Sequence, residues 1–130
     1  MSFYSYDSTT IVGKVGRDAE MKYMPSGEPV TSFSVAVDRS YKKDGDTVKR
    51  TIWYRVQIYG KLAEICKDVT KGDTIMAVGS LDADWQTGAP RIWNKQDGTA
   101  GSSFELTAKE IKFLSQKAKK EQPAEDDSPF

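Results

Sequence analysis

The chain has 130 residues, of which 38% are hydrophobic and 29% are charged, and its formal net charge at pH 7 is zero. These values predict one folded domain with its own core, and they exclude a membrane-spanning helix because no apolar run approaches the roughly 18 residues that such a helix needs. The sequence contains no histidine and one cysteine, Cys66. A histidine base, a Ser–His–Asp triad, a histidine metal site and an intrachain disulfide are therefore excluded.

The first half of the chain has the pattern of β-strands separated by turns. Apolar and β-branched residues predict strands at 10–15, 31–37 and 51–59. A Pro-Ser-Gly sequence within 23–27 predicts a turn, and an Asp-Gly pair within 43–46 predicts the tip of a hairpin.

After Gly60 the pattern becomes helical. Apolar residues recur at spacings of three and four, which predicts one short helix at about 61–70. Gly72 stands where the C-terminal cap of such a helix would fall. The residues expected on its apolar face are Leu62, Ile65, Cys66 and Val69.

The strand pattern then returns. A strand is expected at 73–83, and the polar, glycine-rich segment 86–102 predicts a long hairpin loop. The last strand is expected at 103–113. Its apolar residues stop alternating between Leu106 and Ile111, which predicts a bulge or a bend.

Three strands, one helix and two strands are the order of an all-β OB fold, a five-stranded Greek-key barrel with one helix between strands three and four. We assign residues 1–114 to this domain. Residues 115–130 are polar and charged and include two prolines, so they cannot bury enough apolar surface to fold alone. They are expected to form a flexible acidic tail.

Segment 51–59 carries most of the functional information, because alternate side chains of a strand point to opposite faces. One face, expected to meet the core or another subunit, holds Ile52, Tyr54, Val56 and Ile58. The other face holds Trp53, Arg55, Gln57 and Tyr59. Aromatic rings interleaved with a cation form a platform on which unpaired bases stack. The alternative is that Trp53 and Tyr59 pack under a loop.

Basic residues are concentrated around this strand. Residues 39–61 hold seven Lys or Arg against two Asp, and the last ten residues hold four acids and no base, so residues 1–120 carry a net charge of +4. A local field of this kind favours a polyanion more than the total charge suggests. The expected phosphate contacts are Lys14, Lys22, Arg39, Lys42, Lys43, Lys49, Arg50, Arg55, Lys61 and Arg91. Tyr41 adds an aromatic ring to the basic hairpin.

Trp85 and Trp93 flank Gly88-Ala89-Pro90 in the segment expected to form the long hairpin. This segment has few aliphatic residues, and tryptophan is costly to expose without a function. We expect at least one of the two to stack on DNA; the alternative is packing on a neighbouring subunit. Cys66 is expected to be a buried apolar residue.

The sequence resembles the bacterial single-stranded DNA-binding protein (SSB) family over nearly its whole length. The resemblance rests on IVGKVGRDAEMKYMPSG (11–27), TSFSVAVDRSY (31–41), TIWYRVQIYGKLAEI (51–65), KGD (71–73) and the C-terminal EDDSPF (125–130). It implies an OB fold, a homotetramer, and single-stranded DNA wound over the surface. The stacking positions of the family fall on Tyr41, Trp53, Tyr59 and, on the hairpin, Trp85, with Arg55 as the basic position between them.

The resemblance also implies a role for the tail. In the family, terminal residues bind enzymes of replication, recombination and repair, and these positions correspond to Asp126, Asp127, Pro129 and Phe130. It implies no cofactor. The single cysteine, and a first decapeptide without the basic start and apolar run of a secretory signal, predict a cytoplasmic protein. The resemblance further implies that it is associated with the nucleoid.

Two other classes of function remain open from the sequence. One is an OB-fold adaptor that works mainly through protein contacts, as in a primosome. The acidic tail argues against this, because an adaptor needs no separate recruiting segment. The other is an enzyme, for which we find no carboxylate pair, phosphate loop or metal cluster and so predict no catalytic residue.

Overall fold

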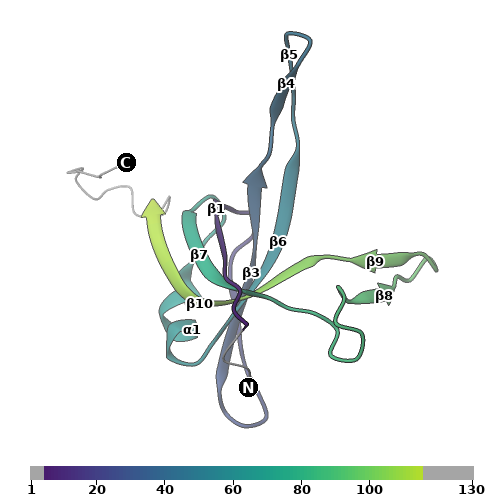
Figure 1. Ribbon diagram of the computed structural model, residues 1–130. Coiled ribbons are helices and arrows are strands. Elements are labelled where there is room, and N and C mark those ends of the chain that lie inside the picture. The colour runs from purple at the N-terminus through teal and green to yellow at the C-terminus, as the bar shows by residue number, and fades with distance from the viewer. Residues whose placement is uncertain (1–4, 116–130) are drawn as a thin grey trace.

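The computed structural model describes residues 5–115 of the chain (Figure 1). Its elements, in chain order, are β1 (Thr9–Val15), β2 (Glu20–Tyr23), β3 (Pro29–Asp38), β4 (Tyr41–Lys43), β5 (Asp46–Val48), β6 (Thr51–Tyr59), α1 (Lys61–Ile65), a 3-10 helix (Cys66–Asp68), β7 (Thr74–Leu81), β8 (Ile92–Asn94), β9 (Ala100–Ser102) and β10 (Phe104–Ser115). The tail residues Asp126, Asp127, Pro129 and Phe130 lie outside the described residues.

Five long strands close into a barrel. They follow the order β1-β7-β10-β6-β3, and the ring closes because the end of β1 also pairs with β3. β2 extends the sheet at the edge of β3. The helix follows the third of these long strands, β6, and precedes the fourth, β7. The predicted OB fold is confirmed.

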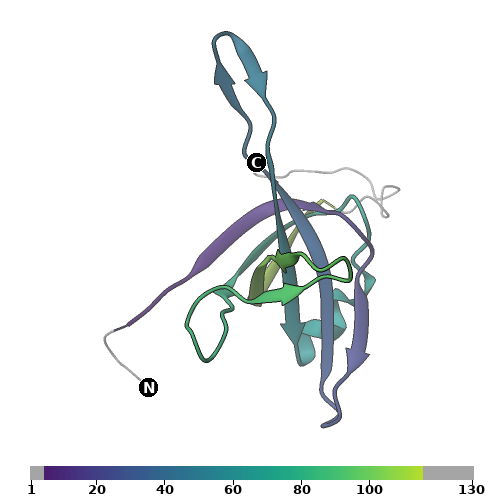
Figure 2. The same cartoon turned by 90° about the vertical axis from the view of Figure 1, so that its right-hand side faces the viewer.

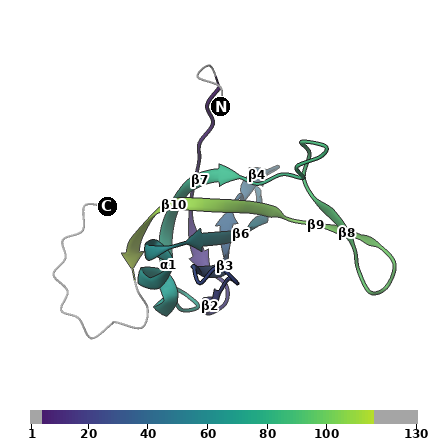
Figure 3. The same cartoon turned by 90° about the horizontal axis from the view of Figure 1, so that it is seen from below.

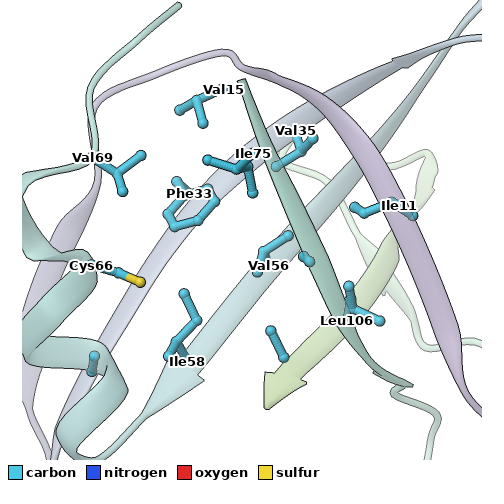
Figure 4. Packing of buried hydrophobic residues seen from close by; sticks show 13 residues of the cluster. Ile11, Val15, Phe33, Val35, Val56, Ile58, Cys66, Val69, Ile75 and Leu106 are labelled. Atoms are coloured by element: carbon cyan, nitrogen blue, oxygen red, sulfur yellow. The ribbon is translucent and has the colours of Figure 1, made fainter. Parts of the chain in front are cut away.

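The interior of the barrel is filled by alternate residues of its strands (Figure 4). Val35, Val56, Ile58 and Ile75 are fully buried, as the period-2 pattern of strands requires. Cys66 and Val69, from the helical segment, close one end of this core (Figure 4). Burial raises the pKa of the Cys66 thiol to about 11, so the thiol stays protonated and unreactive at neutral pH.

The helix is shorter than predicted, and this changes its buried face. α1 ends at Ile65 and continues as a 3-10 helix to Asp68. A 3-10 helix has three residues per turn, and the buried residues recur at that spacing: Ala63, Cys66 and Val69. Ile65, which was predicted to be buried, is exposed. Gly72 is also not the helix cap, because Val69 is already extended; Gly72 instead belongs to the turn before β7.

The predicted bulge in the last strand is confirmed by a register shift between Ala108 and Glu110. Segment 86–102 differs from the single long hairpin predicted for it. Residues 82–91 form a loop, closed by a hydrogen bond from the backbone N–H of Asp84 to the carbonyl of Ala89. A separate short hairpin, β8–β9, follows. The Asp84 carboxylate stabilises the loop by accepting from the backbone N–H of Gln86 and Thr87.

Two hairpins leave the same end of the barrel. β10 runs parallel to β6, with Phe104 beside Tyr54, so both strands start at one end. The β4–β5 hairpin, here called the arm (residues 39–50), precedes β6, and the β8–β9 hairpin precedes β10. They extend in different directions (Figures 1 and 2). The helix lies at the other end of the barrel from the β8–β9 hairpin (Figure 3).

Candidate nucleic-acid interface

The outer face of β6 carries the aromatic and basic side chains expected there. Trp53 is 52% exposed and Tyr59 38% exposed, with Arg55 exposed between them, while Val56 and Ile58 are buried. The two faces of this strand therefore separate as its alternation predicts. The hydroxyl of Tyr59 donates a hydrogen bond of 2.9 Å to the Oε1 of Gln57, which orients the ring along the strand.

Small side chains on β3 leave space beside this face. Ala36 pairs with Trp53, Ser34 with Arg55 and Ser32 with Gln57. Directly opposed residues in an antiparallel pair are close neighbours on one face. Trp53, Arg55 and Gln57 therefore each stand next to a small side chain, whereas Tyr59 pairs with Val30. The outer face is hollowed beside the first three.

Three neighbouring hollows are lined in part by residues of β6. The first, of about 340 Å³, is lined by Trp53, Arg55 and Trp93. The second, of about 200 Å³, shares Arg55 with the first and adds Lys22, Gln57 and Tyr59. The third, of about 600 Å³, shares Gln57 and Tyr59 and adds Trp85 and Arg91. We call the combined lining of these three hollows the β6 track.

Two tryptophans of the track each lie against a glycine. A Cβ on Gly16 would stand 2.5 Å from Cζ3 of Trp53. A Cβ on Gly101, the register partner of Trp93, would stand 2.8 Å from Nε1 of that indole. Both distances are far below van der Waals contact, so a larger residue at either position would displace a ring. Glycine here sets the position of each indole ring.

The structure separates Trp85 from Trp93. Trp93 lies on β8 and lines the same hollow as Trp53. Trp85 lies in the 82–91 loop, is 99% exposed and lines the hollow that contains Tyr59. The sequence placed both on one hairpin around Gly88-Ala89-Pro90. They instead belong to two neighbouring segments, because residues 84–89 close a loop of their own.

The arm carries the basic residues that precede β6. Arg39, Lys42, Lys43, Lys49 and Arg50 are all exposed. The guanidinium of Arg50 lies 5.5 Å from the centre of the Tyr41 ring, a cation–π distance. Tyr41 is thus part of the arm and does not line the β6 track.

A carboxylate lies at the base of the arm. Hydrogen bonds from the hydroxyl and the backbone N–H of Ser40, with a smaller contribution from nearby Lys49, hold the pKa of Asp38 below its usual value. This group is therefore ionised at neutral pH and offsets part of the positive charge of the arm.

Two further predicted phosphate contacts do not line the track but belong to elements next to its strands. Lys14 is exposed near the end of β1, and its register partner Ala36 is also the partner of Trp53. Lys61 is the first residue of α1, two positions after Tyr59.

Among residues 5–115 no group of three or more His, Cys, Asp or Glu is placed to hold a metal ion, and no helix there is long and apolar enough to cross a membrane.

Comparison with known proteins assigns the chain to a family. The sequence model of the single-strand binding protein family matches residues 6–114, which is most of the chain. The chain belongs to this family. Two single-stranded DNA-binding proteins are among its relatives. The protein of Neisseria meningitidis serogroup A is 33% identical over 112 residues, which cover 85% of this chain and 60% of the relative. The protein of Thermotoga maritima is 32% identical over 119 residues, which cover 90% of this chain and 78% of the relative. The chain thus spans about 60% of the length of the Neisseria protein.

Solved structures show the same fold for this family member. The small single-stranded DNA-binding protein of Streptomyces coelicolor aligns with a TM-score of 0.68 at 20% identity, covering 82% of this chain and 93% of that one. The Plasmodium falciparum SSB in its complex with ssDNA aligns with a TM-score of 0.67 at 21% identity, covering 88% of this chain and 100% of that one. At this level of identity the likeness establishes the architecture of the barrel.

Sequence reasoning missed several charged residues of the track in this family member. Arg17 lines the first hollow together with Trp53. Arg17 directly follows Gly16, against which the Trp53 indole lies. The sequence indicates a role for Arg17 only once this packing is known. Glu20 and Glu105 line the same hollow. Glu105 forms an ion pair with Arg91, so Arg91 already has a protein partner. No spacing in the sequence indicates this pair.

Proposed function

We propose that this chain binds single-stranded DNA without sequence preference by stacking bases along the β6 track. The observation that carries the proposal is the alternation on β6, which turns Trp53, Arg55 and Tyr59 outward. Trp53 and Arg55 stand beside small side chains of β3. Aromatic rings stack on any base, at about 1–3 kcal/mol per base. Bases in a duplex have no free face, so a stacking surface selects single strands.

The positions of the exposed basic residues support phosphate contacts along the track and next to it. Lys14, Lys22, Lys61 and Arg55 lie along or beside it, and the cations of the arm extend it at one end. The bacterial relatives are named for binding single-stranded DNA, and the Plasmodium falciparum SSB forms a complex with ssDNA, which agrees with this assignment. Membership of a family named for binding also supports a non-catalytic role that needs no cofactor.

The proposal has a wider part, which rests on the family. The chain would act in the cytoplasm, associated with the nucleoid, as a homotetramer that protects single-stranded DNA during replication, recombination and repair. Exposed apolar side chains outside the track, such as Val12 at 47% exposed, are available for contacts between subunits. The acidic residues Asp126 and Asp127, with Pro129 and Phe130, would recruit enzymes.

Titration with oligo-dT tests the central claim. Tryptophan emission should fall as bases stack on the indoles, and the logarithm of the affinity should fall with the logarithm of salt concentration with a slope of about −0.7 per neutralised phosphate. Light scattering of the same mixture should give four chains per complex. A duplex of equal length is the control, since its bases are paired. If emission does not change with oligo-dT at low salt, or if the duplex quenches it equally, the stacking mechanism is wrong.

Removal of residues 121–130 tests the tail. The truncated chain should bind oligo-dT at least as well as the full chain, because four carboxylates that compete with phosphate are gone. It should lose helicase or nuclease partners in a pull-down from a bacterial extract. Replacement of Phe130 by Ala in the full chain alters a single residue of the tail, and its pull-down can be compared with that of the truncated chain. Partners that persist on the truncated chain would contradict the assignment and favour an adaptor that acts through the barrel.

A further inference from the structure

The β8–β9 hairpin has few connections to the barrel. Its two strands pair only with each other among the described residues. The other backbone hydrogen bonds of segment 83–102, such as that from the N–H of Lys95 to the carbonyl of Thr99, also have both partners inside the segment. A hairpin attached in this way has no ladder to fix its direction. Nevertheless Trp93, on β8, lines the same hollow as Trp53.

The loop that precedes the hairpin is fixed to β10 at both of its ends. At its start, the backbone N–H of Asp82 donates to the carbonyl of Glu105 at 2.8 Å, and the hydroxyl of Thr107 donates to the carboxylate of Asp82. At its end, the guanidinium of Arg91 pairs with the carboxylate of Glu105. Within residues 5–115 this pair is the one ion pair or side-chain hydrogen bond that joins segment 83–102 to the barrel.

The Glu105 carboxylate is well placed to hold the guanidinium. Its side chain is 11% exposed, against 51% for Arg91. A carboxylate this far from solvent needs a partner for its charge, and the Ser103 hydroxyl, at 3.5 Å, is a weak one. Arg55 of the track is the register partner of Glu105 on the neighbouring strand. Glu105 therefore lines the track and at the same time holds the residue that precedes the hairpin.

We propose that Arg91 and Glu105 form a tether that positions Trp93 for stacking, and that Arg91 serves this function rather than phosphate binding. Trp93 follows Arg91 by two residues, so the ion pair fixes the start of β8 on the barrel, while Gly101 fixes the indole on the hairpin. The role in stacking rests on the proposed binding of single-stranded DNA. A stacking ring held in place before binding loses less conformational freedom when a base arrives.

The mobility of Trp93 in the free protein gives a test that does not need DNA. In a background with Trp53→Phe and Trp85→Phe, Trp93 is the sole tryptophan. Arg91→Ala and Glu105→Gln should each lower its fluorescence anisotropy and raise its quenching by acrylamide. Lys43→Ala, on the arm, is the matched control: it removes a cation that has no ion-pair partner within residues 5–115 and should leave Trp93 unchanged. Thermal melting checks that each variant is folded.

Binding measurements in the chain with all three tryptophans then test the consequence. Arg91→Ala and Glu105→Gln should weaken oligo-dT binding by about 2- to 10-fold, the cost of ordering one or a few side chains, with the salt slope unchanged. The combined exchange of Arg91→Glu and Glu105→Arg should restore both anisotropy and affinity. Lys43→Ala should instead reduce the salt slope by about 0.7.

The possible results separate the explanations. The proposal is wrong if Arg91→Ala reduces the salt slope while Trp93 anisotropy stays constant, because Arg91 is then a phosphate contact. It is also wrong if the folded charge exchange behaves like the single variants. If the exchange does not fold, Glu105→Gln decides, since it removes the charge and keeps the shape. If Trp93 responds but the unaltered chain does not bind oligo-dT, the tether stands and the proposed function fails.

Discussion

Replacement of Trp53 by Ala is expected to weaken the binding of oligo-dT by about 1–3 kcal/mol, or roughly 5- to 150-fold. The indole is 52% exposed at one end of the β6 track, where it lines a hollow together with Trp93. Its removal takes away a stacking surface but no core contact, since its strand neighbours Val56 and Ile58 fill the interior. The melting temperature should therefore change little.

Three further variants make this measurement specific. Trp53→Phe keeps an aromatic face and should retain most of the affinity. Gly16→Ala leaves the indole present but moves it, because the new Cβ would stand 2.5 Å from the ring. The affinity for oligo-dT lost in this variant should lie between the losses in Trp53→Phe and Trp53→Ala. Tyr23→Ala removes an exposed ring that lies outside the track and should have no effect. Equal losses from Tyr23→Ala and Trp53→Ala would contradict stacking at a defined site.

Removal of three lysines from the arm should have the second large effect. With Lys42, Lys43 and Lys49 replaced by Ala, the salt slope should decrease by about 2, since each phosphate contact contributes about 0.7. At 0.1 M salt this corresponds to an affinity roughly 100-fold lower, and the loss should nearly vanish toward 1 M salt. Tyr41 and its contact with Arg50 are left intact, so the arm should keep its shape.

Lys67→Ala is the control for this variant. Lys67 is exposed on the 3-10 helix, and the helical segment lies away from the arm (Figure 1). Its removal lowers the net charge of the chain without affecting the arm, so the salt slope should stay constant. If Lys67→Ala reduced the slope as much as each arm lysine does, the effect would be one of total charge and the arm would have no particular role in binding DNA.

The sequence predicts the fold well where one face of an element is buried. The alternation in 51–59 places Trp53 and Tyr59 outside and Val56 and Ile58 inside, and the structure agrees. A shift of one residue would turn the apolar side chains into solvent, so the pattern determines the register. The bulge near Ala108 is predicted for the same reason, because it returns Ile111 and Phe113 to the core side.

Prediction fails where long-range contacts decide the local structure. The apolar spacing of 61–70 fits an α-helix, but the chain tightens to a 3-10 helix so that Ala63, Cys66 and Val69 fit the end of the barrel. The Arg91–Glu105 pair depends on a contact between a loop and β10, and residues 14 positions apart carry no periodic signal of it. The different surroundings of Trp85 and Trp93 follow from that same loop.

The parallel pairing of β6 with β10 makes the spacing of the two hairpins independent of their lengths. The ladder from Phe104–Tyr54 to Thr107–Gln57 sets the distance between the points at which the two hairpins leave the barrel. Insertions or deletions at either hairpin tip alter only how far it reaches. Mutations that change the length of a hairpin loop can thus lengthen or shorten the surface that contacts a ligand. The distance between the points where the hairpins join the barrel stays the same.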